Sequence, residues 1–538
     1  MPLAGRYRQA LFVAGSLLSL GALGALASCQ RQQPVGPVSP APPRKAVPSP
    51  KPASEAAKPS AAAAPSESAV PAQSAPIFDK WPKPAVAFVL TGQQLGYIEP
   101  CGCTGLENQK GGLARRHTLI KQLASDRGWP IVPLDVGSQV KRFGKQQEVK
   151  FAHTAEALRQ IGYRAAALGA DDLRLSADDL LSATNPDDKP SLFVSANVAL
   201  LGRDLQPQYT IASAGGKRIG VTSVLGAQHE ARLQGDKIVH EPPGKALQTI
   251  CAELQAKQCD LYVLLVHAPL DEARKLAQET RIFDLVVASG ESNLPSRELE
   301  TIEGTKTRLL QLGQKAMYVA VVGVFDDQQT PLRYESVPLD ARFADSPQML
   351  KVLADYQEQL KDLGFADLGI KPQPHASGSK FVGSEKCGEC HTKAFEKWSS
   401  TPHAHAIDSL VKPPNSRGDI ARHFDPECLS CHVTGWEPQR YFPYDSGYLS
   451  LERTPQLKHN GCENCHGPGS AHVAAESGEG NSSAADIARL RDAMKLPIAG
   501  GIAEQKCVQC HDDDNSPDFH QPGAFEKYWK EVAHPWKD

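Results

Sequence analysis

Four copies of the pattern Cys-x-x-Cys-His lie in the last third of the chain. Two thiols three residues apart can each bond to one of the two vinyl groups of a porphyrin, and the histidine that follows is then held at the iron as an axial ligand. We therefore expect four covalently bound haem c groups. A pair of zinc ribbons also uses Cys-x-x-Cys, but here a histidine follows every pair and no cysteine of this region is left over. The motifs comprise Cys387, Cys390 and His391; Cys428, Cys431 and His432; Cys462, Cys465 and His466; and Cys507, Cys510 and His511.

Eight further histidines in the same region are candidates for the sixth position of the irons. Two axial imidazoles make an electron-transfer centre, whereas an open position lets a small molecule bind. The region has few regular helix or strand patterns, so we expect a mainly α and irregular domain whose core is supplied by its cofactors. The candidates are His375, His403, His405, His423, His459, His472, His520 and His534.

This region resembles the tetrahaem cytochromes of the hydroxylamine-oxidation pathway. The shared sequence motifs lie at residues 382–384, 398–406 and 462–472, and Tyr528-Trp529 and His534 follow them. The resemblance implies that His403, His472 and His534 are distal ligands, each at a haem other than the one attached beside it. One haem is then either five-coordinate or capped by another histidine, for which His405, His423 and His459 are the alternatives.

The amino terminus has the pattern of a lipoprotein signal peptide over residues 1–28. Basic residues precede an apolar run at 11–26, and Leu-Ala-Ser comes directly before Cys29. Cleavage there would leave Cys29 as the lipid-bearing first residue. Gln30, in place of the Asp that retains such proteins at the inner membrane, favours an exported lipoprotein on the periplasmic side of the outer membrane. The alternative is a plain secretory signal. Residues 29–83, rich in Pro, Ala and Ser, indicate a disordered tether.

Between residues 84 and 345, β-branched runs alternate with helix-like segments, which indicates an α/β layered domain. A helix at 348–363, with Ser346 as cap and Gly364 as stop, fits a connector over 346–374. The haem domain then occupies 375–538. The expected strands are at 85–90, 130–137, 191–198, 218–226, 259–267, 283–290, 307–313 and 316–325.

Residues 84–345 also resemble the metallophosphatase domain of bacterial periplasmic 5′-nucleotidases. The shared sequence motifs lie at residues 111–116, 134–137, 167–169, 195–198 and 265–267. The resemblance implies a four-layer α/β/β/α sandwich with a dinuclear metal site at its strand ends.

Most ligands of that metal site are missing. The family's Thr-Asn-Asp-x-His motif is not conserved at residues 91–95 of this chain. Ser138 occupies the position of the Asp that bridges the two metals, and the motif at 289–292 lacks both of the family's histidines. Only Asp135 and His267 remain, with Asp171 and Asp172 as possible substitutes. Since two-metal hydrolysis needs several hard oxygen and imidazole ligands, we expect no divalent metal in this domain and no ordinary hydrolysis.

Cys101 and Cys103 stand in the loop that should carry metal ligands. With the word at 111–116, this loop resembles nucleotidase-like exported proteins that hold a cysteine or selenocysteine here. Sulfur favours redox chemistry or a soft metal, and a disulfide between residues so close would be strained and easily reduced. The alternative is a structural turn. Cys251 and Cys259 could close a short structural disulfide.

The net charge of −3 gives no indication of a nucleic-acid partner. The expected partners are redox proteins, either other cytochromes or a quinol-linked donor, and a membrane reached through the lipid anchor. An electron-transfer protein or oxidoreductase is favoured over a hydrolase. The alternatives are an active metallophosphoesterase with a haem appendage and an oxidoreductase for nitrogen or sulfur oxyanions at an open haem.

Overall fold

The computed structural model describes residues 77–535, apart from 102–107, 187–189, 234–236, 328, 414–418 and 480. Residues Ala75–Asp538 form one compact unit. The signal peptide, Cys29, most of the tether and Cys103 lie outside the described residues. The last residues assigned to the tether belong to the fold, because Phe78 is buried and packs edge-on against Trp81 and Trp129.

Two sheets form the centre of the N-terminal domain. The first has the strand order β15-β14-β1-β4-β5, in which β1 lies parallel to β4 and antiparallel to β14. Its strands are β1 (Val86–Thr91), β4 (Ile131–Asp135), β5 (Ala165–Ala166), β14 (Tyr318–Val324) and β15 (Leu332–Pro338).

The second sheet has the order β12-β13-β11-β10-β8-β7, with a parallel core. Its strands are β7 (Tyr209–Ala214), β8 (Lys217–Leu225), β10 (Leu261–His267), β11 (Leu285–Ala288), β12 (Glu300–Thr301) and β13 (Arg308–Gln311). Short pairs join β2 (Pro100–Cys101) to β3 (Lys110–Gly111), and β6 (Val198–Leu200) to β9 (Ile238–His240).

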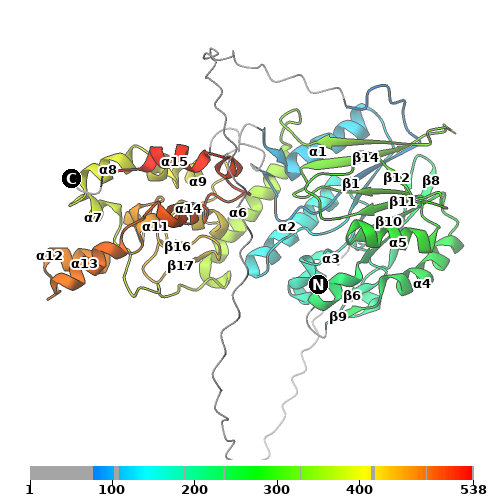
Figure 1. Ribbon diagram of the computed structural model, residues 1–538. Coiled ribbons are helices and arrows are strands. Elements are labelled where there is room, and N and C mark those ends of the chain that lie inside the picture. The colour runs from blue at the N-terminus through cyan, green and yellow to red at the C-terminus, as the bar shows by residue number, and fades with distance from the viewer. Residues whose placement is uncertain are drawn as a thin grey trace, which may run out of the picture. The chain divides into compact units, whose positions relative to one another are not determined.

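The alternation of side chains along β1 explains why the sheets pack face to face. Val86, Phe88 and Leu90 point into the apolar cluster between the sheets, whereas Ala87 and Val89 point to the helices outside. Because both faces are covered, the strand is a continuous apolar run. Helices α1 (Leu113–Lys121), α2 (Lys145–Ile161) and α6 (Pro347–Asp367) cover the first sheet, and α4 (Pro243–Ala256) and α5 (Leu270–Thr280) cover the second (Figure 1). The predicted α/β/β/α sandwich is confirmed.

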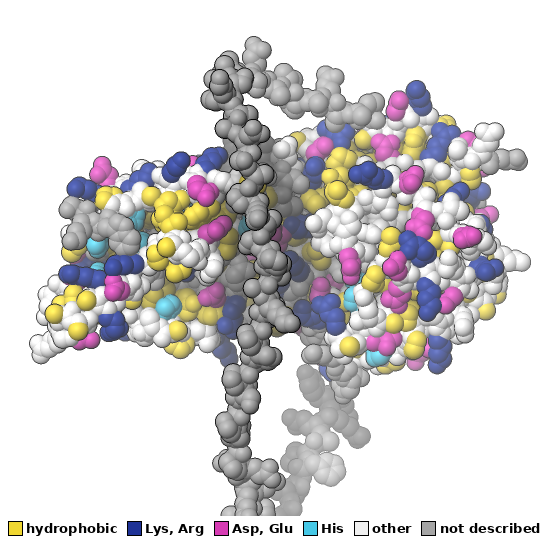
Figure 2. Space-filling model, in the orientation of Figure 1, with side chains coloured by type: hydrophobic (Ala, Val, Ile, Leu, Met, Phe, Trp, Pro, Cys, Tyr) yellow, Lys and Arg dark blue, Asp and Glu magenta, His cyan; other side chains and the backbone are white. Residues whose placement is uncertain are grey.

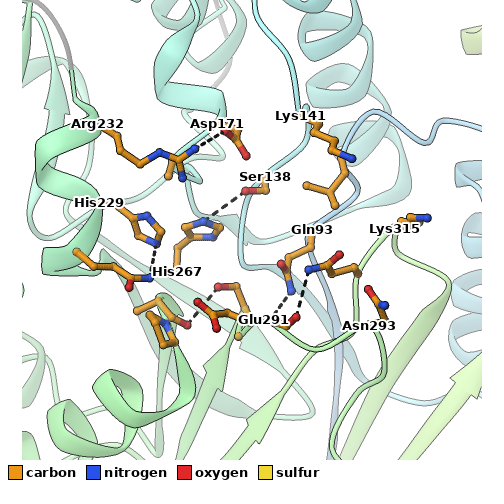
Figure 3. Close-up of a pocket in the computed structure, with 18 of the residues that line it drawn as sticks. Gln93, Ser138, Lys141, Asp171, His229, Arg232, His267, Glu291, Asn293 and Lys315 are labelled. Atoms are coloured by element: carbon orange, nitrogen blue, oxygen red, sulfur yellow. Dashed lines mark hydrogen bonds and ion pairs between the residues drawn. The ribbon is translucent and has the colours of Figure 1, made fainter. Parts of the chain in front are cut away.

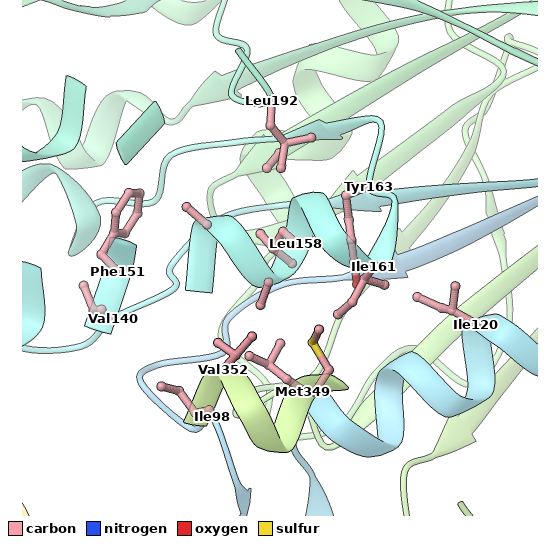
Figure 4. Close-up of a cluster of buried hydrophobic side chains, with 14 of the residues drawn as sticks. Ile98, Ile120, Val140, Phe151, Leu158, Ile161, Tyr163, Leu192, Met349 and Val352 are labelled. Carbon is pink, nitrogen blue, oxygen red and sulfur yellow. The ribbon is translucent and has the colours of Figure 1, made fainter. Parts of the chain in front are cut away.

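The predicted connecting helix is confirmed as α6. Its buried residues recur at 349, 352, 353, 356 and 360, the spacing of one helical face, and Met349 and Val352 face Leu158 of α2 (Figure 4). Gly364 interrupts the helical geometry with a φ of 61°. Ser346 precedes the helix, but its hydroxyl bonds to His117 Nδ1 at 2.7 Å and caps no backbone group.

One strand prediction is wrong. Residues 191–197 run as a loop that pairs with the first sheet through a bridge between Phe193 and Ala166, and Val198 begins β6. Most of the loop's side chains are buried, so the segment is apolar although it forms no ladder of strand hydrogen bonds. Strands β7 and β15 lie outside the predicted set. Helix α3 (Ala177–Thr184) completes this domain.

The C-terminal part is mainly helical, as expected. Its apolar cluster is small, with Leu429, Val433 and Trp436 near its centre, and Phe365 at the end of α6 packs on it. Helices this short need tertiary support. They are α7 (Ser384–Gly388), α8 (Thr392–Ser399), α9 (Asp408–Val411), α10 (Pro426–His432), α11 (Cys462–His466), α12 (Ser470–Ser477), α13 (Ala484–Ala493), α14 (Ile502–Cys507) and α15 (Ala524–Val532), with strands β16 (Trp436–Glu437) and β17 (Phe442–Pro443).

A buried ionic contact joins the two parts at the start of α10. Glu427 accepts hydrogen bonds from Lys150 at 2.6 Å and from Arg142 at 2.9 Å, both from the N-terminal domain. Further hydrogen bonds join Asp425 to Gln146 and Gln357, and Arg422 to Glu99. The second haem motif is therefore tied directly to the sandwich.

Among the described residues, no helix has the length and apolar character that a membrane span requires. On the face drawn in Figure 2, acidic and basic side chains are interspersed. This pattern agrees with the nearly balanced charge of the chain.

Candidate functional site

Each Cys-x-x-Cys-His motif forms about one turn of helix. In the first and fourth motifs the backbone N–H of the histidine donates to the carbonyl of the first cysteine, from His391 to Cys387 and from His511 to Cys507, both at 2.9 Å. Because a turn has 3.6 residues, the two thiols and the imidazole emerge on one side. All eight motif cysteines carry free thiols, the form that thioether bonds require.

Three of the motif histidines face a second histidine across a gap that fits an iron. Two imidazoles on opposite sides of one metal ion lie roughly 6 Å apart between ring centres, because each metal–nitrogen bond is ~2 Å and each nitrogen lies ~1 Å from its ring centre. The ring centres are 6.3 Å apart for His391 and His472, 6.0 Å for His511 and His403, and 5.7 Å for His466 and His534.

Each of these pairs joins a motif to a histidine that follows a different motif in the sequence. His472 follows the third motif and faces the first, His403 follows the first and faces the fourth, and His534 follows the fourth and faces the third. The structure thus places His403, His472 and His534 each opposite a motif histidine, and their role as distal ligands stays a prediction.

Hydrogen bonds to carbonyl groups set the tautomer of two motif histidines, His432 and His466. His432 and His466 donate from Nδ1 to the carbonyls of Ala406 and Met494, at 2.6 and 2.7 Å, and His511 Nδ1 lies 3.0 Å from Ser516 Oγ. An imidazole that donates from Nδ1 keeps Nε2 free for a metal. Burial lowers the pKa of His466, and that of His511 to about 4, so both rings are neutral, as a metal ligand must be.

The motifs also lie next to one another in pairs. The thiols of Cys387 and Cys462 lie close enough to shift each other's pKa, and so do those of Cys431 and Cys510. The first motif is therefore beside the third, and the second is beside the fourth. With the histidine gaps, this arrangement fits haem groups held close together.

The remaining candidate histidines make other contacts. His405 faces His459 with ring centres 6.1 Å apart and lies 3.5 Å from Asp408, and His423 packs on Phe424. His459 is buried and has a positive φ of 77°. His375 packs on Tyr444 and Phe381, and His520 bonds to the carbonyl of His511.

A cavity of about 420 Å³ lies at the carboxyl ends of the central strands of the sandwich. Gln93 follows β1, Ser138 follows β4, His267 ends β10 and Ser289 follows β11. This edge is where open α/β sheets bind ligands. Figure 3 shows Gln93, Ser138 and His267 facing the cavity, with Lys141 and Lys315 on one side and His229 and Arg232 on the other.

Asp135 cannot serve this cavity as a metal ligand. It is fully buried and accepts hydrogen bonds from Thr91 Oγ1 at 2.6 Å, Gln139 Nε2 at 2.6 Å and the Gly137 N–H at 2.9 Å. The guanidinium of Arg116, also fully buried, lies 3.9 Å away and compensates its charge. The carboxylate is therefore committed to protein partners.

Asp172 is committed in the same way. It is buried and accepts from the backbone N–H groups of Ser138, Gly169 and Val140 at 2.8, 2.9 and 3.1 Å. Burial raises its pKa to about 7. Asp171 lines the cavity but pairs with Arg174 and Arg232 at 3.5 and 3.4 Å.

His267 lines the cavity as a neutral imidazole. Its Nδ1 lies 3.3 Å from the Val136 carbonyl and its Nε2 3.4 Å from Ser138 Oγ, and burial lowers its pKa to about 3. In the part of the chain that the structure describes, no cluster of three or more His, Cys, Asp or Glu side chains could hold a metal ion. The residues at this site do not fit a dinuclear metal centre.

Cys101 is buried and disulfide-bonded, and the ten other cysteines of the described part are free. The Cys101 sulfur lies 4.0 Å from the carbonyl oxygen of Asp514, just after the fourth haem motif. The predicted disulfide between Cys251 and Cys259 is wrong, because Cys251 points into the core beneath α4, where burial raises its pKa to about 11.

Sequence reasoning missed the residues that position the site from a distance. Met494 and Ala406 contribute only carbonyls, for which side-chain patterns give no signal. Lys315 and Asp514 bond to each other across 199 residues. Ser516, five residues after His511, could have been found as a local partner.

Residues 386–467 match the protein family described as cytochrome c554 and c-prime. This stretch holds the first three haem motifs, so the predicted cytochrome family of the C-terminal part is confirmed. Cytochrome c-554 of Nitrosomonas europaea is 36% identical over 106 residues, which are 18% of this chain and 42% of that protein. An apyrase of Aedes albopictus is 24% identical over 180 residues, 29% of this chain and 32% of that protein. The chain thus spans less than half the length of these curated relatives.

Solved structures similar to the chain include a 5′-nucleotidase precursor of Thermus thermophilus, with 20% identity and a TM-score of 0.44. That match covers 52% of this chain and 59% of the other. A calcineurin-like phosphoesterase of Bacillus subtilis matches with 14% identity and a TM-score of 0.42, over 51% of this chain and 97% of the other.

Proposed function

We propose that the chain is an exported multihaem cytochrome that carries electrons through four covalent haem c groups, with a nucleotidase-like domain that has lost hydrolysis. The observation that carries the proposal is the set of three histidine pairs, spaced 5.7 to 6.3 Å apart, beside Cys-x-x-Cys-His turns. The cytochrome match over residues 386–467 supports it. The haem domain would occupy 375–538 and the sandwich 84–345.

The chain's residues would hold each haem in the same way. The two thiols of a motif would bond to the vinyl carbons, and the motif histidine would ligate the iron, through Nε2 where Nδ1 donates to a carbonyl as in His432 and His466. Bound haem c supplies one-electron transfer. His472, His403 and His534 would be the distal ligands at the first, fourth and third motifs. At the second motif the open site and the caps His405, His423 and His459 remain alternatives.

A haem count on the purified full chain tests the proposal directly. The pyridine haemochromogen assay should give four haems per chain, and the EPR spectrum should contain at least three low-spin signals with two imidazole ligands. A count below four overturns the assignment of the motifs. A high-spin signal that shifts with nitrite, hydroxylamine or carbon monoxide would instead favour an oxidoreductase acting at an open haem.

The loss of hydrolysis rests on the commitment of Asp135 and Asp172 to protein hydrogen bonds. Purified protein should leave p-nitrophenyl phosphate and nucleotides intact with added Mg²⁺, Mn²⁺ or Zn²⁺, because no ligand set holds two ions to activate water. Metal-dependent turnover above that of a heat-denatured sample would restore the metallophosphoesterase alternative. This outcome would leave the haem assignment untouched.

A thiol redox site at Cys101 is a second candidate. The disulfide-bonded sulfur lies next to the segment that follows the fourth haem motif. Reduction breaks the S–S bond, forms two thiols and consumes two electrons and two protons, for which c-type haem is the donor class in the same chain. Alkylation before and after chemical reduction of the haems, read by mass spectrometry, tests it. Labelling at Cys101 that does not depend on the haem redox state excludes this role.

Export and anchoring complete the proposal. Cys29 would carry the lipid at the periplasmic face of the outer membrane, and other cytochromes or a quinol-linked donor would be the partners. Metabolic labelling with a fatty acid should mark the wild type but not Cys29→Ser, and the variant should move to the soluble periplasmic fraction. Equal membrane recovery of both proteins contradicts the anchor.

A further inference from the structure

The segment that follows the fourth haem motif forms one wall of the sandwich cavity. Asp513 and Asp514 line this cavity together with Gln93, Ser138 and His267 from the strand ends. Asp514 lies three residues after His511. A ligand bound in the cavity would therefore touch both the former phosphatase site and the chain beside a haem motif.

Asp514 occupies the space between two lysines of the cavity wall. Its Oδ1 accepts a hydrogen bond from Lys315 Nζ, and its Oδ2 lies 3.5 Å from Lys141 Nζ. The Lys315 side chain is only 14% exposed and also packs on the ring of Tyr97. A carboxylate of the chain itself thus sits where two ammonium groups converge, and it marks a position suited to a small oxyanion.

Backbone strain is concentrated around the same cavity. Gln93, Leu95, Ser138 and Lys315 all line it, and their φ angles are 49°, 55°, 60° and 59°. A left-handed backbone costs a residue other than glycine about 1 to 2 kcal/mol. Strain of this kind gathers at ligand and switch sites, where a side chain must be held in one direction.

Each cation that lines the cavity already faces a carboxylate, and Lys315 and Lys141 are the two that share a single one, Asp514. Asp171 already pairs with Arg174 and Arg232, while Glu291 and Asp513 lie on the wall. His267 and Ser138 add neutral hydrogen-bonding groups. An oxyanion that displaced Asp514 would gain Lys315 and Lys141.

A short turn links Asp514 to the axial position of the fourth motif. The Asp512 carboxylate accepts from the N–H groups of Asp514 and Asn515, and the Ser516 N–H donates to the Asp512 carbonyl at 2.8 Å. Ser516 Oγ then lies 3.0 Å from Nδ1 of His511. The hydrogen-bond partner of a metal-ligating histidine affects the basicity and orientation of that ligand. A displacement of this turn would therefore change the hydrogen bond between Ser516 and His511.

We propose that this cavity is an oxyanion site in which the ligand competes with Asp514 for Lys315 and Lys141, so that its occupancy is coupled to the redox state of the haem at His511. The inference rests on the proposed function for that haem. Coupling is reciprocal, and a tenfold difference in anion affinity between the two redox states corresponds to about 59 mV for a one-electron centre.

Sulfate is the probe, used with the full haem-loaded chain. Calorimetry should detect sulfate binding, and an optical redox titration should show one of the four haem midpoints shifting when sulfate replaces chloride at equal ionic strength. Lys315→Gln should abolish both effects. Asp514→Asn removes the competing charge and should bind sulfate ~10-fold more tightly. Lys351→Gln, an exposed lysine of α6 paired with Asp355, is the matched control and should behave as wild type.

Intact haem spectra with no sulfate binding, or a shift that persists unchanged in Lys315→Gln, overturn the coupling and leave the cytochrome assignment standing. Preferential binding of Mn²⁺ over sulfate would also overturn it, because it would make the cavity a cation site. A haem count below four would instead overturn the proposed function on which this inference rests. If Lys315→Gln loses haem, Asp514→Asn alone decides, since only competition predicts tighter sulfate binding.

Discussion

Glu427→Gln should destabilise the protein, because the buried Lys150 ammonium loses the carboxylate to which it donates a hydrogen bond and keeps only the charge of nearby Asp425. Lys150 is 7% exposed at its side chain and donates to Glu427 at 2.6 Å. Removing one member of a buried ion pair costs about 3 to 5 kcal/mol. Glu427 is itself 21% exposed and the glutamine carbonyl can still accept a hydrogen bond, so we expect the lower end, about 3 kcal/mol.

The same pair predicts how stability depends on pH. Burial alone would raise the pKa of Glu427, but Lys150 and Arg142 outweigh it and lower the pKa from 4.5 to about 2. A carboxyl group whose pKa is lower in the folded state stabilises the fold at pH values above 4.5 and loses that contribution as the pH falls towards 2. Glu427→Gln should lack this acid-dependent loss.

Urea unfolding followed by tryptophan fluorescence at pH 7 and at pH 3 is the assay. Glu358→Gln is the matched control, because Glu358 pairs with Lys361 on the exposed face of α6 and should change stability by less than about 0.5 kcal/mol. The double variant Lys150→Met with Glu427→Met should recover most of the loss, since it removes both charges. If Glu427→Gln unfolds at the same urea concentration as the control variant, the buried pair does not hold α10 to the sandwich.

Three further outcomes are expected. His472→Ala should convert one low-spin EPR signal to high spin, whereas His240→Ala, on exposed strand β9, should leave the spectrum unchanged. Leu158→Ala should lower the free energy of unfolding by about 3 kcal/mol by opening a cavity under α2, against little change for Leu201→Ala, which is 41% exposed. Cys101→Ser should add one maleimide-reactive thiol per chain, because the disulfide partner is released; an unchanged thiol count would contradict the disulfide.

Most strands were predictable because they depend on local pattern, whereas the exchanged histidines were expected only from the resemblance to the tetrahaem cytochromes. Apolar runs such as 85–90 and 259–267 have both faces covered in the sandwich, so their composition alone marks them as strands. The same signal fails at 191–198, where burial without a ladder produces an equally apolar run. Composition reports burial, and only hydrogen bonding distinguishes a strand from a buried loop.

Residue types predicted that this site would hold no metal, but they did not show how the surviving carboxylate is bound. Asp135 looks like a ligand in the sequence, and only the fold shows Thr91 and Gln139 bonded to it with Arg116 nearby. Two of these three partners lie outside its own loop, and none changes the motif that contains Asp135. A carboxylate can therefore remain in a metal-site motif while its oxygens bind protein groups instead of a metal.

The contacts that join the two parts give the sandwich a structural role beside the haem motifs. Glu427 lies directly before Cys428 of the second motif, and Asp514 lies just after the fourth, and both bind lysines of the sandwich. The thiols of these two motifs also touch, through Cys431 and Cys510. A haem pair built on these motifs would be held from both ends by the sandwich. Whatever reaction the sandwich does or does not catalyse, its lysines bind the chain on either side of these two motifs and so help to fix their geometry.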